Sequence, residues 1–232
     1  MSGGRTTRLL KMIIMGAPGS GKGTISKRIV SDLHLHFLSS GDALRNEIES
    51  KNDVGRLCEK YMKKGLLVPD EILDRIIFDK LKSFKDAGWL LDGFPRTLTQ
   101  AIALYREELV PDLVIDLQVP FEVIIDRLKD RWVHPGSGRI YNLQYNKPKI
   151  PGLDDLTGEP LIQRHDDQPD TVLARLEHYK ELTIPVSEFF RDRHKLVSFT
   201  GSESDVIWPE IRKYLHDYLD RRQAEDESQI YL

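Results

Sequence analysis

The chain has 232 residues, of which 40% are hydrophobic and 31% are charged. This composition excludes a disordered chain and a membrane-spanning bundle, and the length suits one large domain or one domain with an insertion. The 34 basic and 37 acidic side chains leave a net charge of −3, so no overall basic field favours nucleic-acid binding. The single cysteine, Cys58, cannot form an internal disulfide. It indicates a reducing compartment, and we expect it to be a buried helix residue.

The N-terminal region is basic. Residues 1–31 contain no acid, and their basic residues are Arg5, Arg8, Lys11, Lys22, Lys27 and Arg28. Organelle transit sequences share this bias. Alternatively, Lys22, Lys27 and Arg28 belong to the glycine-rich loop and helix described below, and only the other three basic residues are unexplained. The apolar run at 9–15 is far shorter than the ~20 residues that a bilayer-spanning helix needs, so we expect no membrane association.

Short apolar runs rich in branched residues alternate with segments of helical periodicity. This alternation predicts a parallel sheet covered by helices on both faces. The predicted strands lie at 9–15, 37–39, 89–91, 113–119 and 196–199. The predicted helices lie at 22–33, 42–50, 54–64, 70–83, 98–107, 121–131, 171–192 and 205–221. The polar and charged segment 220–232 is predicted to be a flexible tail.

The periodicity is lost between Trp132 and Gln168, where glycines and prolines mingle. A structureless loop of this length is improbable inside a compact domain. We therefore expect a small inserted subdomain of turns and short strands, able to move as a lid.

A glycine-rich loop, Gly16-Ala17-Pro18-Gly19-Ser20-Gly21-Lys22, follows the first predicted strand and opens a helix. In this context the G-x-x-x-x-G-K pattern predicts phosphate binding, because backbone N–H groups and the helix N-terminus attract anionic oxygens. Lys22 is expected to reach the β- and γ-phosphates. Gly23 stands where a hydroxyl residue is usual and Thr24 comes one place later, so direct magnesium ligation by a hydroxyl is left open.

A second segment, Leu90 to Arg96, leaves another strand end and is expected to lie beside this loop, at the edge where open sheets bind ligands. Asp92 is suited to orient magnesium through water, since magnesium often keeps its hydration shell. Arg96 is a candidate phosphate clamp. Taken alone, Asp92-Gly93 would be a turn and Arg96 a surface cation, so this interpretation depends on the neighbouring loop.

Three segments in this order, Gly16–Thr24, Ser39–Arg45 and Asp92–Thr97, resemble the adenylate kinases. Asp154–Arg164 resembles the long-lid branch of that family, and within it the mitochondrial members that use GTP. The resemblance covers about 9–219. It implies an α/β P-loop nucleoside monophosphate kinase fold, with a five-stranded parallel sheet flanked by helices. It also implies a core at 1–39, 70–131 and 169–219, an AMP-binding arm at 40–69 and a lid at 132–168, followed by the tail predicted at 220–232.

The implied activity is reversible, magnesium-dependent transfer of a γ-phosphoryl group from GTP, or from ATP or ITP, to AMP. The implied protein is a monomer of the mitochondrial matrix, with the cytoplasm as the alternative, and has no nucleic-acid or membrane partner. An ATP-preferring adenylate kinase, another monophosphate kinase and a nucleotide-binding regulator without turnover stay open as alternatives. The segment Asn146–Lys149 superficially resembles a guanine-reading motif, but it lies in the insertion and lacks the expected Asp.

The resemblance also assigns roles to individual residues. The cations expected around the migrating group are Lys22, Arg96, Arg127, Arg131, Arg164 and Arg175, with Asp166 and Asp167 holding the arginines. Expected triphosphate contacts are Gly19, Ser20, Gly21, Lys22, Gly23, Thr24, Arg127, Ile140, Tyr141 and Ser202, with Tyr145 adding surface for the base. Expected AMP contacts are Ser40, Arg45, Leu66, Val68, Gly93, Phe94, Arg96, Gln100, Arg164 and Arg175. Asp92 is assigned to magnesium through water. Because Arg127 and Arg131 are four residues apart in a predicted helix, we expect them to share a face.

Four residues of the insertion, His134, Ser137, Asp154 and Thr157, stand where some relatives place zinc-binding cysteines. The insertion contains no cysteine, and Ser and Thr are poor zinc ligands. We therefore expect a hydrogen-bonded network and no structural zinc.

Overall fold

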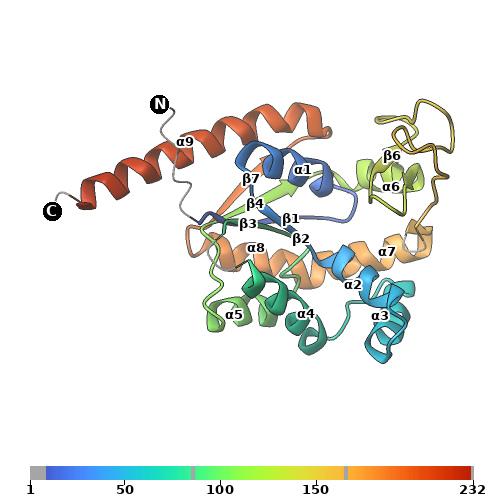
Figure 1. Ribbon diagram of the computed structural model, residues 1–232, viewed down its shortest axis with the longest axis horizontal. Coiled ribbons are helices and arrows are strands. Elements are labelled where there is room, and N and C mark those ends of the chain that lie inside the picture. The colour runs from blue at the N-terminus through green and yellow to red at the C-terminus, as the bar shows by residue number, and fades with distance from the viewer. Residues whose placement is uncertain (1–8, 85–86, 165–166, 231–232) are drawn as a thin grey trace.

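The computed structural model describes residues 9–84, 87–164 and 167–230. A five-stranded parallel sheet forms its centre, with the strand order β2-β3-β1-β4-β7 (Figure 1). Its strands are β1 (Lys11–Gly16), β2 (His36–Ser39), β3 (Trp89–Asp92), β4 (Leu113–Gln118) and β7 (Leu196–Thr200). The predicted five-stranded parallel sheet is confirmed, with β1 between β3 and β4.

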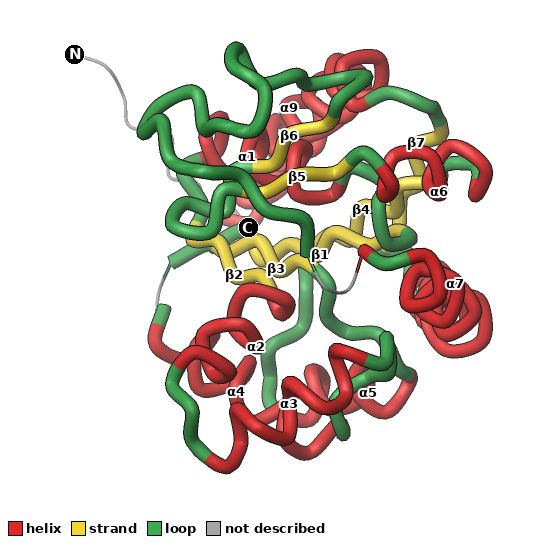
Figure 2. Tube along the Cα trace, turned by 90° about the vertical axis from the view of Figure 1, so that its right-hand side faces the viewer, coloured by secondary structure: helices red, strands yellow, loops and turns green. Residues whose placement is uncertain are grey.

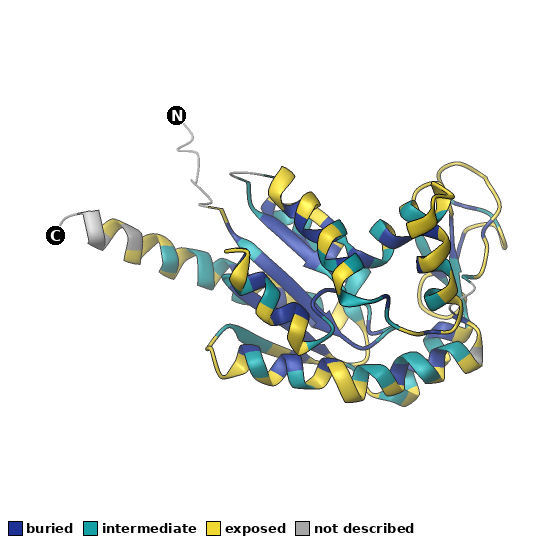
Figure 3. Ribbon diagram, turned by 90° about the horizontal axis from the view of Figure 1, so that it is seen from below, coloured by how far each residue is buried: buried dark blue, intermediate teal, exposed yellow. Residues whose placement is uncertain are grey.

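Helices cover both faces of this sheet, because apolar residues alternate between the faces along each strand. Ile13 and Met15 pack against α4, α5 and α8, while Met12 and Ile14 pack against α1 and α9. These helices are α1 (Lys22–Leu33), α4 (Asp70–Ser83), α5 (Leu98–Arg106), α8 (Ile184–Arg191) and α9 (Ser204–Ile230). Figure 3 shows the strands buried and the outer helix faces exposed.

Two further helices, α2 (Ser40–Glu49) and α3 (Asp53–Lys63), pack against each other beside α4. Polar caps begin both: the Ser39 hydroxyl accepts from Asp42 N, and Asn52 Oδ1 accepts from Gly55 N at 2.7 Å. Cys58 is buried in α3, as predicted. In Figure 2 these helices lie on the opposite side of the sheet from β5 and β6.

The inserted segment begins where α6 (Phe121–Lys129) ends. It contains an antiparallel pair, β5 (Arg131–Val133) and β6 (Ile140–Asn142). The prediction that Arg127 and Arg131 share one helix is wrong, because Arg131 pairs with Asn142 in this ladder. Strand pairing with residues about ten positions later overrides the local helical periodicity.

The helix predicted at 171–192 is interrupted. The structure has α7 (Pro169–His178), a π-helix (Tyr179–Thr183) and then α8. Pro185 explains the break, because proline lacks an N–H and its ring clashes with the carbonyl four residues earlier.

The last helix, α9, continues through Ile230, so 222–230 is helical where the sequence predicted a flexible tail at 220–232. Exposed i,i+4 pairs such as Lys213–Asp217 and Gln223–Glu227 support it. None of the described helices is long and apolar enough to cross a membrane.

Candidate active site

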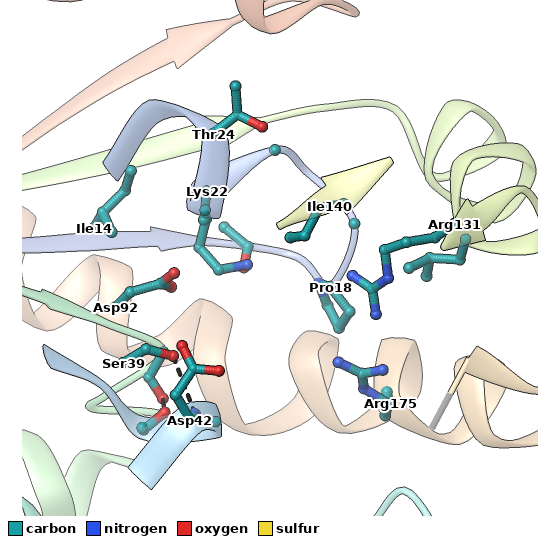
Figure 4. Close-up of a pocket in the computed structure, with 18 of the residues that line it drawn as sticks. Ile14, Pro18, Lys22, Thr24, Ser39, Asp42, Asp92, Arg131, Ile140 and Arg175 are labelled. Atoms are coloured by element: carbon teal, nitrogen blue, oxygen red, sulfur yellow. Dashed lines mark hydrogen bonds between the residues drawn. The ribbon is translucent and has the colours of Figure 1, made fainter. Parts of the chain in front are cut away.

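A cavity of about 500 Å³ opens at the carboxyl edge of the sheet. The ends of three neighbouring strands form the floor of this cavity. Their register places Asp92 at the end of β3 opposite both Ile14 in β1 and Ser39 in β2. The loop 16–22, the start of α2, the loop after β3 and the inserted segment form the walls (Figure 4). The predicted site residues that line it are Gly19, Gly21, Lys22, Gly23, Thr24, Ser40, Arg45, Leu66, Val68, Asp92, Gly93, Phe94, Arg96, Arg127, Arg131, Ile140, Tyr141, Tyr145, Arg164 and Arg175.

Three predicted residues, Ser20, Gln100 and Ser202, lie outside this lining. Ser20 and Gln100 are buried. Ser202 is exposed and accepts a hydrogen bond from Arg127 with its carbonyl oxygen. Their predicted substrate contacts therefore stay predictions.

The glycine-rich loop leaves β1 through a position that only glycine fits. Gly16 has a φ of +140°, and a Cβ built there would stand 2.7 Å from the carbonyl oxygen of Leu117 in β4. A backbone oxygen cannot move aside as a flexible side chain could. The tight contact with the neighbouring strand therefore fixes where the glycine-rich loop begins.

Lys22 is held by the loop itself. Its Nζ donates to the carbonyl oxygens of Gly16 at 2.7 Å and Ala17 at 2.8 Å. Burial lowers the pKa of Lys22 to about 8, although the nearby charge of Asp92 opposes this shift. Burial also raises the pKa of Asp92, against the charges of Lys22 and Arg96. Both side chains point into the same space in Figure 4.

The loop after β3 places two of the predicted site side chains on one backbone oxygen. The Gly93 carbonyl accepts from Ser40 Oγ and from Arg96 Nε, each at 2.7 Å. Gly93 has a φ of +78°, and a Cβ there would be 2.7 Å from Ser40 Oγ. Glycine at this turn therefore allows α2 and the Arg96 loop to approach each other closely.

Arg45, one turn into α2, is paired with the Asp42 carboxylate. Burial alone would raise the pKa of Asp42, but the charge and hydrogen bond of Arg45 more than offset it, so that this pKa lies below its usual range. The pair keeps the guanidinium of Arg45 at the cavity wall.

Gln100 is fully buried, and its amide has two partners inside the protein. Its Nε2 donates to Asp70 Oδ1 at 2.7 Å, and its Oε1 accepts from the Arg96 backbone N–H at 2.7 Å. Sequence reasoning missed Asp70, because nothing local in the sequence links α4 to a loop about 26 residues later.

Three arginines converge from α6, β5 and α7. Arg131 makes a two-pronged contact with Asp167, whose Oδ1 also lies 3.6 Å from Arg175 Nη1. Arg127 stacks over the Tyr145 ring, 5.2 Å from its centroid. The predicted role of Asp167 thus has a geometric basis, while Asp166 lies outside the described residues.

The inserted segment is held together by the carboxylate of Asp154. Arg139 Nε donates to its Oδ1 at 2.7 Å, and Thr157 N and Oγ1 both donate to Oδ2. His134 Nδ1 lies 2.7 Å from Ser137 Oγ. The hydrogen bond from Arg139 holds the pKa of Asp154 far below its usual range.

Tyr141, predicted to contact the donor base, belongs mainly to this network. The residue is only 4% exposed, and its hydroxyl donates to Asp154 Oδ1 while accepting from Asp155 N, both at 2.9 Å. Ile140 and Tyr145 are the more open neighbours. Among the described residues, no three His, Cys, Asp or Glu side chains are grouped closely enough to hold a metal ion.

The family model for adenylate kinase matches residues 14–195, which span the glycine-rich loop, the Arg96 loop and the inserted segment. The chain belongs to the adenylate kinase family. "GTP:AMP phosphotransferase, mitochondrial" of Drosophila melanogaster is 43% identical over 211 residues, covering 91% of this chain and 97% of that protein. The protein of the same name from Saccharomyces cerevisiae is 43% identical over 213 residues, covering 87% and 90%. In this adenylate kinase, the cations predicted for the site and Asp92 lie around one cavity.

Proposed function

We propose that this protein transfers the γ-phosphoryl group of a nucleoside triphosphate, with GTP preferred, to AMP, and that it acts in mitochondria. The names and the 43% identity of the fly and yeast relatives support the donor, the acceptor and the location. The basic bias of residues 1–31 is compatible with the location.

The observation that carries this proposal is the gathering of cations from four separate segments at one cavity. Lys22 comes from the glycine-rich loop, Arg96 from the loop after β3, Arg131 from β5 and Arg175 from α7. Cations in this arrangement suit a reaction in which charge is spread over phosphoryl oxygens. We assign no general base, because the accepting phosphate oxygen of AMP is already ionised. Alignment and charge stabilisation suffice.

The donor and acceptor would occupy opposite ends of the cavity. We assign the triphosphate to the loop 16–24, with its base near Ile140, Tyr145 and Arg127. We assign AMP to the segment 40–69, with its phosphate facing Arg45 and Arg96 and its base near Leu66 and Val68. The segment 132–168 would act as a lid that excludes water, the competing acceptor.

Asp92 and Thr24 fit the magnesium ion that accompanies the triphosphate. Both line the cavity beside the loop, and carboxylate and hydroxyl oxygens, often through water, are the ligands that magnesium prefers. Bound there, the ion would neutralise charge on the phosphate oxygens. Asp92 would hold its water shell, while Lys22 holds the phosphate.

Steady-state kinetics with purified full-length protein test this proposal. With AMP fixed and GTP, ATP and ITP varied, we expect the highest kcat/KM with GTP. With GTP fixed, we expect AMP to be used and UMP and CMP to be poor acceptors. A Lys22→Ala preparation controls for contaminating kinases. A preference for ATP would contradict the proposed donor, and a preference for UMP or CMP would contradict the proposed acceptor. Absence of turnover with every donor and acceptor pair would contradict the proposed enzymatic activity.

A further inference from the structure

Arg96 is held at three atoms by three different parts of the chain. Its side-chain Nε donates to Gly93, its backbone N–H donates to Gln100 Oε1, and its backbone carbonyl accepts from Thr183 Oγ1 at 3.0 Å. Only the first bond lies within the loop after β3. The position of this arginine therefore depends on α5 and the π-helix as well as on its own turn.

The orientation of the Gln100 amide decides whether it can accept from Arg96. An amide has a donating and an accepting end, and Gln100 needs its oxygen toward the Arg96 N–H. Asp70 enforces this, since an ionised carboxylate can only accept hydrogen bonds. The Gln100 NH₂ group must face Asp70 Oδ1, so the carbonyl oxygen must face Arg96.

The second oxygen of Asp70 completes the arrangement. It accepts from Thr97 Oγ1 at 2.8 Å, and Thr97 Oγ1 in turn accepts from the Gln100 backbone N–H at 3.1 Å. Thr97 caps the start of α5 in this way. One carboxylate thus fixes both the start of the helix that carries Gln100 and the direction of its amide.

Asp70 is also adjacent to the acceptor end of the cavity. It opens α4, where the helix N-terminus favours a negative charge. The residues just before it, 65–68, line the cavity. A shift of this segment would reach the Arg96 loop through Asp70.

We propose that Asp70 is a positioning residue for Arg96, acting through the Gln100 amide whose orientation it dictates. This inference rests on the proposed function, because Arg96 is assigned there to the phosphoryl group. Asp70 touches no substrate in this arrangement. Its contribution is the polarity of the hydrogen-bond chain Asp70–Gln100–Arg96.

The main test is a double-mutant cycle. Asp70 accepts from two donors, Thr97 Oγ1 and Gln100 Nε2, and Asp70→Asn sets an NH₂ group against one of them. If the Gln100 amide rotated to relieve this clash, its own NH₂ group would face the Arg96 N–H. We expect kcat to fall roughly tenfold, the scale of one misplaced hydrogen bond. In an Arg96→Ala background the same change should lower kcat less than twofold, because the residue through which it acts is gone.

A swapped pair tests the polarity directly. In Asp70→Asn with Gln100→Glu, the new asparagine can donate to the new carboxylate, which can still accept from the Arg96 N–H. At saturating AMP we expect this double variant to have a higher kcat than either single variant, because Gln100→Glu alone sets two carboxylates face to face. The swap also covers the case in which Asp70→Asn alone folds poorly.

Asp74→Asn is the matched control, one turn further along α4. The Asp74 Oδ1 atom is buried without a hydrogen-bond partner among the described residues, and burial together with the charge of Asp70 raises its pKa to about 6. This variant should keep wild-type kcat.

Three outcomes would overturn the inference. They are wild-type kcat in Asp70→Asn, an equal loss with and without Arg96, or a swapped pair as impaired as the single variants. Wild-type turnover with GTP and AMP is measured first, so that a failure of the proposed function can be distinguished from a failure of the inference about Asp70.

Discussion

On the floor of the cavity, functional candidates are held by hydrogen bonds to backbone carbonyls at the ends of strands. In the segment 132–168, proposed as a lid, arginines are held by ion pairs with carboxylate side chains. On the floor, Lys22 is bound to Gly16 and Ala17, and Arg96 to Gly93. In the lid, Arg139 is bound to Asp154, and at its base Arg131 is bound to Asp167. The floor rests on a buried sheet, while few apolar side chains of the lid are buried.

This difference separates two tasks. A carbonyl carries no titratable charge, so the hydrogen-bond acceptors on the floor are the same over a wide range of pH and salt. Ion pairs can exchange one anionic partner for another, and a phosphate can replace a carboxylate opposite arginine. We therefore expect the arginines at the base of the proposed lid to change partners when nucleotides bind, while the backbone of the floor stays in place.

The largest expected effect is on the floor. Lys22→Ala should lower kcat by roughly 10²-fold or more, because it removes a cation from the migrating phosphoryl group. Its melting temperature should stay near that of the wild type. Lys27→Ala, in the same helix and also lining the cavity, should lose much less. Near-normal turnover in Lys22→Ala would mean that the floor does not carry the chemistry.

The next effect is a pH dependence confined to the floor. Lys22 must be protonated to hold phosphate, and its pKa of about 8 in the free protein means that it loses its proton as pH rises through 8. We expect kcat/KM for the donor to fall above that pH, approaching about tenfold per unit.

At saturation, kcat should fall only at higher pH, because bound phosphates favour the protonated lysine. ATP should be assayed in parallel with GTP, since the adenine base does not lose a proton in this range. A flat kcat/KM profile between pH 7 and pH 10 would contradict this assignment.

A lid variant should affect the lid alone. Asp154→Asn removes the charge that Arg139 contacts, and we expect roughly tenfold faster amide hydrogen exchange within 132–164, with the sheet unchanged. Glu159→Gln, in the same network but with an exposed carboxylate, should have a smaller effect. Equal acceleration in β1 and β4 would show that the lid and the floor unfold as one unit.

The pH response of the lid should have the opposite sign to that of the floor. The pKa of Asp154 is depressed in the folded protein. Its contribution to stability is therefore fully present above the carboxylate's unfolded pKa of about 4 and is lost only as pH falls below it. Hydrogen exchange within 132–164, corrected for the intrinsic rate, should show no loss of lid protection between pH 6 and pH 9.

The smallest expected effect is that of a chelator. If hydrogen bonds alone hold His134, Ser137, Asp154 and Thr157, purified protein should contain no stoichiometric zinc, and chelation without substrate should leave its melting temperature unchanged. Elemental analysis that found about one zinc per chain would refute this account of the lid and leave the family assignment intact.

Much of the floor could be predicted from the sequence, because its signals are local. The glycine pattern before Lys22 lies within seven residues, and Asp92 ends a short apolar run. Parallel strand order then brings the two together at one edge. The remaining contacts depend on tertiary pairing, which has no local signal. Arg131 pairs with Asn142 in a strand and is not part of the predicted helix, and Gln100 contacts Asp70 of α4. Pro185 was visible in the sequence, and its effect on helix geometry could have been anticipated.

The contacts of Lys22 with its own loop mean that this long side chain is already ordered before any donor arrives. An unrestrained lysine loses up to about 1.5–2 kcal/mol of rotamer entropy when it is fixed in one conformation. Here that loss is incurred during folding, so a triphosphate meets a preorganised ammonium and only exchanges two carbonyl oxygens for phosphate oxygens. When the product leaves, the same carbonyls can take the ammonium back, so the lysine need not become disordered between turnovers.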